Sequence, residues 1–139
     1  MRVVLDTNSL LASIAKKSKY RPIFDGILRG KFTVLISNEI LSEYTEIIER
    51  KASPVVAANI SELLVQAKSV EKIEIFFKWL LLFSDEDDDK FVDCAVSGNA
   101  DFIVTDDKHF NALKNIEFPA VKVIKTKDFL AIILALDKE

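Results

Sequence analysis

Residues 1–10, MRVVLDTNSL, run from an apolar stretch directly into an acid. Val3, Val4 and Leu5 predict a short buried strand over residues 3–6, so that Asp6 stands where the strand ends. Asp6 can be the N-cap of a helix predicted over residues 8–16. It can also be a catalytic acid at the carboxyl edge of a parallel sheet, where open α/β folds bind their ligands. This stretch alone leaves both interpretations open.

Composition limits the class of protein. The 139 residues fit one domain spanning 1–139, and 50% apolar content with only three glycines is typical of a compact globular chain. One cysteine, Cys94, and one histidine, His109, exclude an internal disulfide and a Cys/His zinc site within the chain. We expect a cytoplasmic protein, since no signal-like start and no apolar run of about 20 residues is present. The net charge of −3 gives no bulk attraction for nucleic acid, which would need local lysines and a metal ion.

Strand-like and helix-like patterns alternate along the chain without a linker or repeat. Strands are predicted over 32–37, 101–105 and 121–124, and residues 80–83 are predicted as a short strand or a buried connection. Helices are predicted over residues 21–29, 39–51, 54–68, 87–97, 108–115 and 126–136. Strands separated by helices indicate parallel neighbours joined by right-handed crossovers, and hence an α/β fold.

Acids recur at the predicted carboxyl edge of this sheet. Asp6 ends the first strand, Asp106 and Asp107 follow the strand over 101–105, and Glu43 lies about a turn into the helix after the second strand. The stretch SDEDDDKFVD adds six acids at residues 85–89 and 93, at the start of a helix. Each acid has a structural explanation as a cap, a solvated helix face or a partner of the helix dipole. Their recurrence after successive strands favours a common site.

Clustered carboxylates indicate a cation. A like-charged pair about 4 Å apart costs about 4 kcal/mol at an effective dielectric constant near 20, so the cluster would take up protons or bind metal. Oxygen ligands suit Mg²⁺ or Mn²⁺, which can activate water and stabilise the leaving oxygen of a phosphodiester. Phosphodiester hydrolysis is therefore the predicted chemistry.

Three blocks closely resemble the PIN-domain family of metal-dependent ribonucleases, which includes the toxins of toxin-antitoxin operons. They are VVLDTNSLLASI (3–14), SNEILSEYTEII (37–48) and DEDDDKFVDCAVSGNADFIVTDDKHF (85–110). The resemblance implies a three-layer α/β/α sandwich with a central parallel sheet and a Mg²⁺- or Mn²⁺-dependent endoribonuclease. It implies four catalytic, metal-binding acids, which are Asp6, Glu43, Asp89 and Asp107. The 18-residue separation from Asp107 favours Asp89 over Asp85, Asp87 and Asp88.

Further residues follow from the same resemblance. Asn8 and Thr105 match polar residues that flank the family's site, and Asp93, one turn beyond Asp89, is a further candidate metal ligand. Asp106 stands where the family often has glycine and is a rival to Asp107 as the fourth acid. The lysines expected to meet RNA phosphates are Lys16, Lys17, Lys19, Lys90 and Lys108.

The implied partners are an RNA substrate, a small antitoxin protein and a second copy of the chain. Homodimer contacts are expected through the apolar helices that contain residues 22–28 and 55–65. One alternative is a catalytically inactive PIN-like module that binds RNA or protein. Another is a receiver-like phosphoacceptor using Asp6, Thr105 and Lys125, although no paired acid stands beside Asp6 and no acceptor aspartate ends a middle strand.

Overall fold

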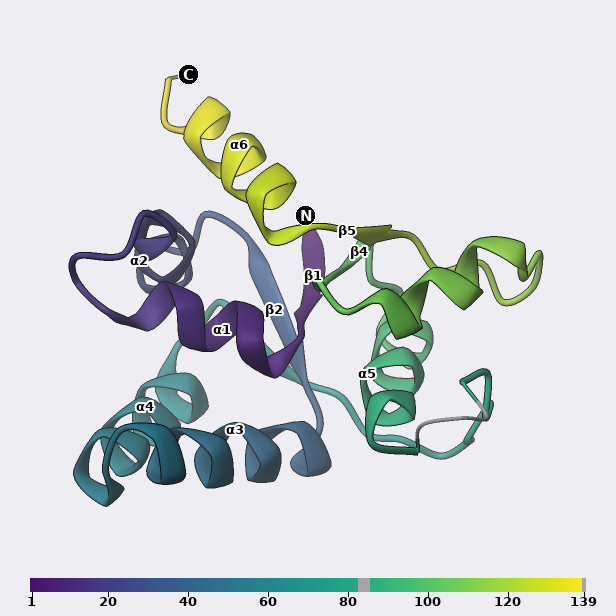
Figure 1. The fold of residues 1–139 in the computed structure, drawn as a ribbon, viewed down its shortest axis with the longest axis horizontal. Coiled ribbons are helices and arrows are strands. Elements are labelled where there is room, and N and C mark those ends of the chain that lie inside the picture. The colour runs from purple at the N-terminus through teal and green to yellow at the C-terminus, as the bar shows by residue number, and fades with distance from the viewer. Residues whose placement is uncertain (83–85, 139) are drawn as a thin grey trace.

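The computed structural model describes residues 1–82 and 86–138, and within these ranges five strands form one sheet (Figure 1). The strand order is β3-β2-β1-β4-β5, and every neighbouring pair is parallel. The strands are β1 (Arg2–Leu5), β2 (Thr33–Ile36), β3 (Val70–Lys72), β4 (Phe102–Val104) and β5 (Val123–Ile124). The carboxyl ends of all five therefore lie at one edge of the sheet.

Helices flank this sheet on both sides. The helical elements are α1 (Thr7–Ile14), α2 (Arg21–Arg29), α3 (Asn38–Lys51), α4 (Pro54–Gln66), α5 (Glu86–Ser97), the 3₁₀ helix η1 (Lys108–Asn115) and α6 (Thr126–Leu136). Helix α5 packs on β1, β2 and β4, while α2 packs between α1 and α6 (Figure 1). The predicted α/β architecture with a parallel sheet is thus confirmed. Among the described helices, none has the length and apolarity to cross a bilayer.

The central strand β1 accounts for the position of the first acid. Val3, Val4 and Leu5 are fully buried because β1 has neighbours on both edges and helices on both faces. Asp6 immediately follows, and its main-chain N–H still donates to the Val104 carbonyl of β4 at 3.0 Å. The sheet hydrogen bonding therefore continues to Asp6 and fixes its backbone at the carboxyl edge.

The third strand lies elsewhere than predicted. Of the two alternatives predicted for residues 80–83, the strand is wrong for 80–82; these residues form a connection in which Leu82 is buried and Leu80 is exposed, and residue 83 lies outside the described residues. The third strand is instead Val70–Lys72, at the edge of the sheet beside β2. Its two charged residues, Glu71 and Lys72, are exposed, and charged side chains are common on edge strands. A strand with one apolar residue in three gives no hydrophobic pattern that sequence analysis can detect.

Candidate active site

Asp6 forms the centre of the site and combines both roles considered for it. It is the N-cap of α1, where its Oδ1 accepts a hydrogen bond from the Thr7 amide at 2.8 Å. Its side chain is almost completely buried, and this burial raises the pKa of Asp6 above its usual value of 3.8. Hydrogen bonds from Thr105 and Thr7 oppose the rise in the pKa, while the nearby charges of Asp107 and Glu43 add to it.

Thr105 connects two of the predicted acids. This buried residue follows β4, and its hydroxyl donates to Asp6 Oδ2 at 2.6 Å. The same hydroxyl oxygen accepts a hydrogen bond from the Asp107 amide at 3.0 Å. Thr105 therefore fixes the Asp6 carboxylate and the backbone that carries Asp107 relative to each other.

Glu43 reaches the site from α3, the helix that begins at the carboxyl end of β2. Its Oε2 accepts a short hydrogen bond from the Thr7 hydroxyl, and its Oε1 lies 2.7 Å from Lys90 Nζ of α5. Lys90 also lies 4.0 Å from Asp87 Oδ1. The positive charge of Lys90 is thus directed at Glu43, and one predicted RNA-contacting lysine is engaged within the protein.

Asp107 begins η1, beside Asp88 of α5. Its Oδ1 accepts a hydrogen bond from the His109 amide at 2.9 Å and lies 3.5 Å from His109 Nδ1. Asp88 Oδ2 lies 3.4 Å from the same imidazole nitrogen. Asp88, Asp107 and His109 each offer a ligand atom, and these atoms lie within 4.8 Å of one another. This arrangement could hold a metal ion.

Asp89 and Asp93, which lie one turn apart on α5, contact the preceding segment. Asp89 Oδ1 accepts from the Leu82 amide at 2.8 Å, and Asp93 Oδ1 accepts from the Trp79 amide at 3.0 Å. Burial, reinforced by the charge of Asp89, raises the pKa of Asp93 above its usual value. Within the described part of the chain, the buried Oδ2 of Asp89 has no hydrogen-bond partner. These two acids therefore hold residues 79–82 against α5, and one carboxylate oxygen of Asp89 remains for a cation.

Asp106 makes different contacts from Asp107. Its two carboxylate oxygens accept from the amide and the hydroxyl of Thr126, each at 2.9 Å, at the start of α6. The Thr126 hydroxyl is also 2.8 Å from Ser9 Oγ of α1, so this network links α1, the end of β4 and α6. Asn8, the other predicted flanking residue, is exposed on α1. Asp85 of the acidic run lies outside the described residues.

Comparison with known proteins identifies the family. The family model described as "PIN domain" matches residues 2–109, which include every acid described above. The chain belongs to the PIN-domain family. A search of curated protein sequences gives no match for this PIN domain.

Solved structures of low sequence identity share the fold of this PIN domain. VapBC2 from Rickettsia felis, bound to a DNA fragment from its promoter, matches with a TM-score of 0.60 and 17% identity over 90% of this chain and 98% of that chain. DNA-bound VapBC from Salmonella typhimurium matches with a TM-score of 0.57 and 15% identity over 91% and 98%. The PIN domain endonuclease Utp24 matches with a TM-score of 0.54 and 18% identity over 89% and 84%.

The donor set fits the metal site expected in a PIN domain. Carboxylate oxygens from the residue after β1, from α3, from α5 and from the residue before η1 lie at one sheet edge, and the Asp88–Asp107–His109 group adds an imidazole. Such donors suit a hard or borderline divalent cation. No spacing motif in the sequence points to His109 as a member of this group. Its position two residues after Asp107, in the same turn, brings it into the cluster.

Proposed function

We propose that this PIN domain is a Mg²⁺- or Mn²⁺-dependent endoribonuclease that hydrolyses phosphodiester bonds of single-stranded or structured RNA. The supporting observation is that Asp6, Glu43 and Asp107 come from three separate parts of the chain and are brought together by Thr7, which contacts both Asp6 and Glu43, and by Thr105, which contacts both Asp6 and the Asp107 amide. A fold that needed these residues only as caps would gain nothing from bringing their charges together. A divalent cation bound between these carboxylates would neutralise their repulsion, and their negative charges would in turn hold the cation.

We propose Asp6, Glu43 and Asp107 as metal-binding and catalytic acids, with a fourth acid from α5. Two neighbouring residues compete for that place. Asp88 is supported by its position in the cluster with Asp107 and His109, where ligand atoms lie within 4.8 Å. Asp89 is supported by the family resemblance and by its buried Oδ2, which lacks a described hydrogen-bond partner.

The chain's own groups prepare the site for hydrolysis. Thr105 and Thr7 orient the two oxygens of Asp6, while Lys90 holds Glu43 in place. Burial raises the pKa of Asp6, and the charges of Asp107 and Glu43 add to this rise, so the ionised carboxylate is destabilised until a cation is bound. A bound divalent cation would supply charge neutralisation for the phosphate oxygens and a lowered pKa for a coordinated water.

We further propose that the protein is the toxin of a toxin-antitoxin pair and acts in the cytoplasm. The fold shared with two VapBC structures supports a small antitoxin partner. Cys94 is a buried free thiol, which suits a reducing compartment. Exposed apolar side chains on α2 and α4, namely Leu28, Val55, Leu63 and Val65, support a homodimer through these helices.

Two linked measurements test the proposed activity. Calorimetric titration with Mn²⁺ should show binding to the wild type and loss of binding in Asp6→Asn, which removes the charge, keeps the size of the side chain and replaces one of its two acceptor oxygens with an NH₂ group. Cleavage of a labelled single-stranded RNA should require Mn²⁺ or Mg²⁺ and disappear in the same variant. RNA binding with neither metal binding nor cleavage would instead identify a catalytically inactive RNA-binding module.

A further inference from the structure

A hollow of about 190 Å³ lies directly beside Asp107 and is lined by three lysines. Lys108 follows Asp107 at the start of η1, Lys114 lies near the end of the same 3₁₀ helix, and Lys125 connects β5 to α6. We call this hollow the lysine pocket. Thr105 and Asp107 belong both to the wall of this pocket and to the candidate active site, so the two adjoin directly.

The three pocket lysines make no ion pair with any residue in the described ranges 1–82 and 86–138. Among the described residues, no carboxylate oxygen lies within 4.0 Å of the ammonium group of Lys108, Lys114 or Lys125. The nearby Asp106 carboxylate accepts two hydrogen bonds from Thr126. Lys90 differs from these three lysines, because it is paired with Glu43 at 2.7 Å. The pocket lysines therefore remain available to an anion.

A second hollow flanks the site on the side of Glu43 and has the opposite charge balance. Its volume is about 680 Å³, and its charged lining residues are Glu39, Glu43, Glu46, Asp87, Arg50 and Lys90. Four carboxylates against two cations make this side unfavourable for a phosphate. The lysine pocket has three lysines and two acids, Asp106 and Asp107. A polyanion bound at the candidate active site is therefore attracted toward the lysine pocket rather than toward the hollow beside Glu43.

We propose that the lysine pocket binds a backbone phosphate of the RNA substrate, adjacent to the phosphate that is cleaved. The proposal rests on the proposed ribonuclease function and adds a position for the substrate. A chain with a net charge of −3 and a cluster of buried acids repels RNA, and a phosphate subsite beside Asp107 counteracts this repulsion. The flexible, ammonium-tipped side chains of lysine act as point charges for phosphate and need no planar geometry.

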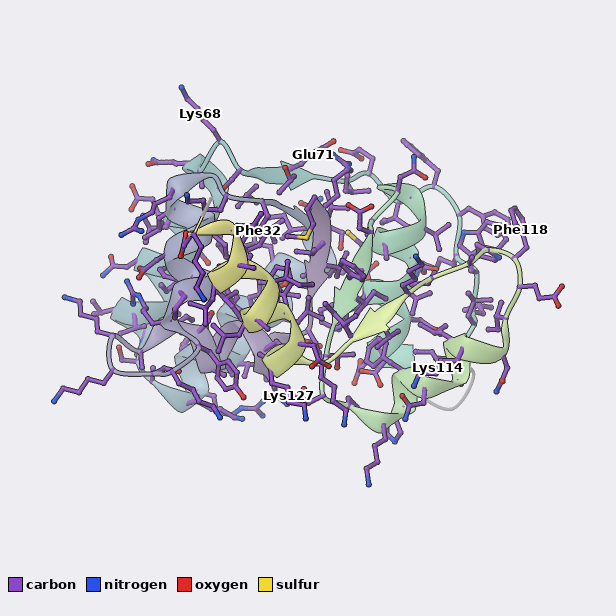
Figure 2. All side chains as sticks on the ribbon, turned by 90° about the horizontal axis from the view of Figure 1, so that it is seen from above. Phe32, Lys68, Glu71, Lys114, Phe118 and Lys127 are labelled. Atoms are coloured by element: carbon purple, nitrogen blue, oxygen red, sulfur yellow. The ribbon has the colours of Figure 1, made fainter. Side chains whose placement is uncertain are left out.

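The test compares two triple variants of equal charge change. The pocket variant carries Lys108→Ala, Lys114→Ala and Lys125→Ala. The control variant replaces three exposed lysines away from the lysine pocket with alanine, namely Lys51 at the end of α3, Lys68 before β3 and Lys138 after α6. Figure 2 shows Lys68 and Lys114 at widely separated places on the molecule. All six lysines are exposed, so neither variant removes core packing.

Both triple variants are measured in the Asp6→Asn background, in EDTA, for binding to a fluorescent single-stranded RNA across a range of salt concentrations. The pocket variant should bind about tenfold more weakly, and the slope of log K against log salt should fall by about 0.7 for each phosphate that the lysines no longer neutralise. The control variant should change affinity by less than about twofold, since long-range charge is screened beyond about 10 Å at moderate salt. Equally weakened binding in both variants would overturn the proposal.

A second arm locates the phosphate. In the background with Asp6 intact, cut sites are mapped, and RNAs with one neutral methylphosphonate on either side of the cut are compared. One of the two replacements should slow wild-type cleavage about tenfold and have little further effect in the pocket variant, because coupled contacts are not additive. If each methylphosphonate slows the pocket variant by the same factor as the wild type, the lysine pocket does not contact either phosphate and the proposal is refuted. If the wild type cleaves RNA and the pocket variant cleaves it at the same rate, the proposed phosphate subsite is refuted but the ribonuclease function stands. If the wild type neither binds nor cleaves RNA, the proposed function is refuted as well.

Discussion

Replacing Thr105 with valine removes one hydroxyl that serves two acids and leaves the side chain nearly the same shape. The hydrogen bond that this hydroxyl donates to the Asp6 carboxylate at 2.6 Å contributes about 1.5–3 kcal/mol, because its acceptor is charged. The hydrogen bond that it accepts from the Asp107 amide at 3.0 Å contributes about 0.5–1.5 kcal/mol. We therefore expect Thr105→Val to lower the free energy of unfolding by about 2–4.5 kcal/mol. The pKa of Asp6 should rise further, since the Thr105 hydrogen bond lowers it.

Thr45→Val is the matched control. The Thr45 hydroxyl donates to the Leu41 carbonyl at 2.9 Å and lies 2.5 Å from Ser61 Oγ, and both partners are neutral. Removing this hydroxyl should cost about 0.5–1.5 kcal/mol and leave metal-dependent cleavage unchanged. Urea unfolding in EDTA, followed by the fluorescence of Trp79 and by far-UV circular dichroism, measures both variants. A Thr105→Val protein that matches the wild type in both stability and cleavage would refute the reasoning that Thr105 organises the site.

Three further predictions concern charges and the buried thiol. Because the pKa of Asp6 is raised above 3.8 in the folded state, Asp6 should contribute its full stability to the metal-free protein below about pH 3.8, and this contribution should disappear as the pH rises through the folded-state pKa. Thermal melts in EDTA should show this loss of stability in the wild type and a smaller loss in Asp6→Asn. Asp88→Asn should abolish the rise in melting temperature that Mn²⁺ produces. Asp89→Ala should keep that rise but lower the unfolding free energy of the metal-free protein by about 1–3 kcal/mol, because the Leu82 amide then has no acceptor. The reverse pattern would assign the metal ligand to Asp89. Cys94 is fully buried and burial raises its pKa to about 12, so iodoacetamide at about pH 8 should modify it only in urea, and rapid labelling of the native protein would contradict its described position.

The sequence was sufficient to predict the elements in which local pattern and burial agree. The apolar residues of β1 and β4 and the polar residue at the end of each strand predicted a parallel sheet with acids at its carboxyl edge, and the fold has this arrangement. The edge strand β3 escaped prediction because two of its three residues, Glu71 and Lys72, are exposed and charged. Its pairing with β2, and the ion pair of Glu71 with Arg2 at 2.6 Å, are visible only in the folded chain.

The orientation of the acids on α5 also lay beyond sequence analysis. Asp87, Asp88 and Asp89 are consecutive, and each step turns a side chain by about 100° around the helix. Which of them faces Asp107 depends on how residues 79–82 pack against α5, where Asp89 accepts the Leu82 amide. The pairing of Lys90 with Glu43 similarly joins two helices far apart in sequence. Counting residues back from Asp107 could not reveal either contact.

Cleavage by two matched variants, Asp107→Asn and Asp106→Asn, tests most directly the claim that the acids at the sheet edge form a metal-dependent ribonuclease site. Both substitutions remove one charge at adjacent positions, and asparagine retains an acceptor for the Thr126 contacts of residue 106. Single-turnover cleavage of single-stranded RNA in Mn²⁺ should fall at least about a hundredfold in Asp107→Asn, or about 2.7 kcal/mol of transition-state stabilisation, and less than about tenfold in Asp106→Asn. An inactive Asp106→Asn beside an active Asp107→Asn would contradict the account and place the acid on the residue that here contacts Thr126.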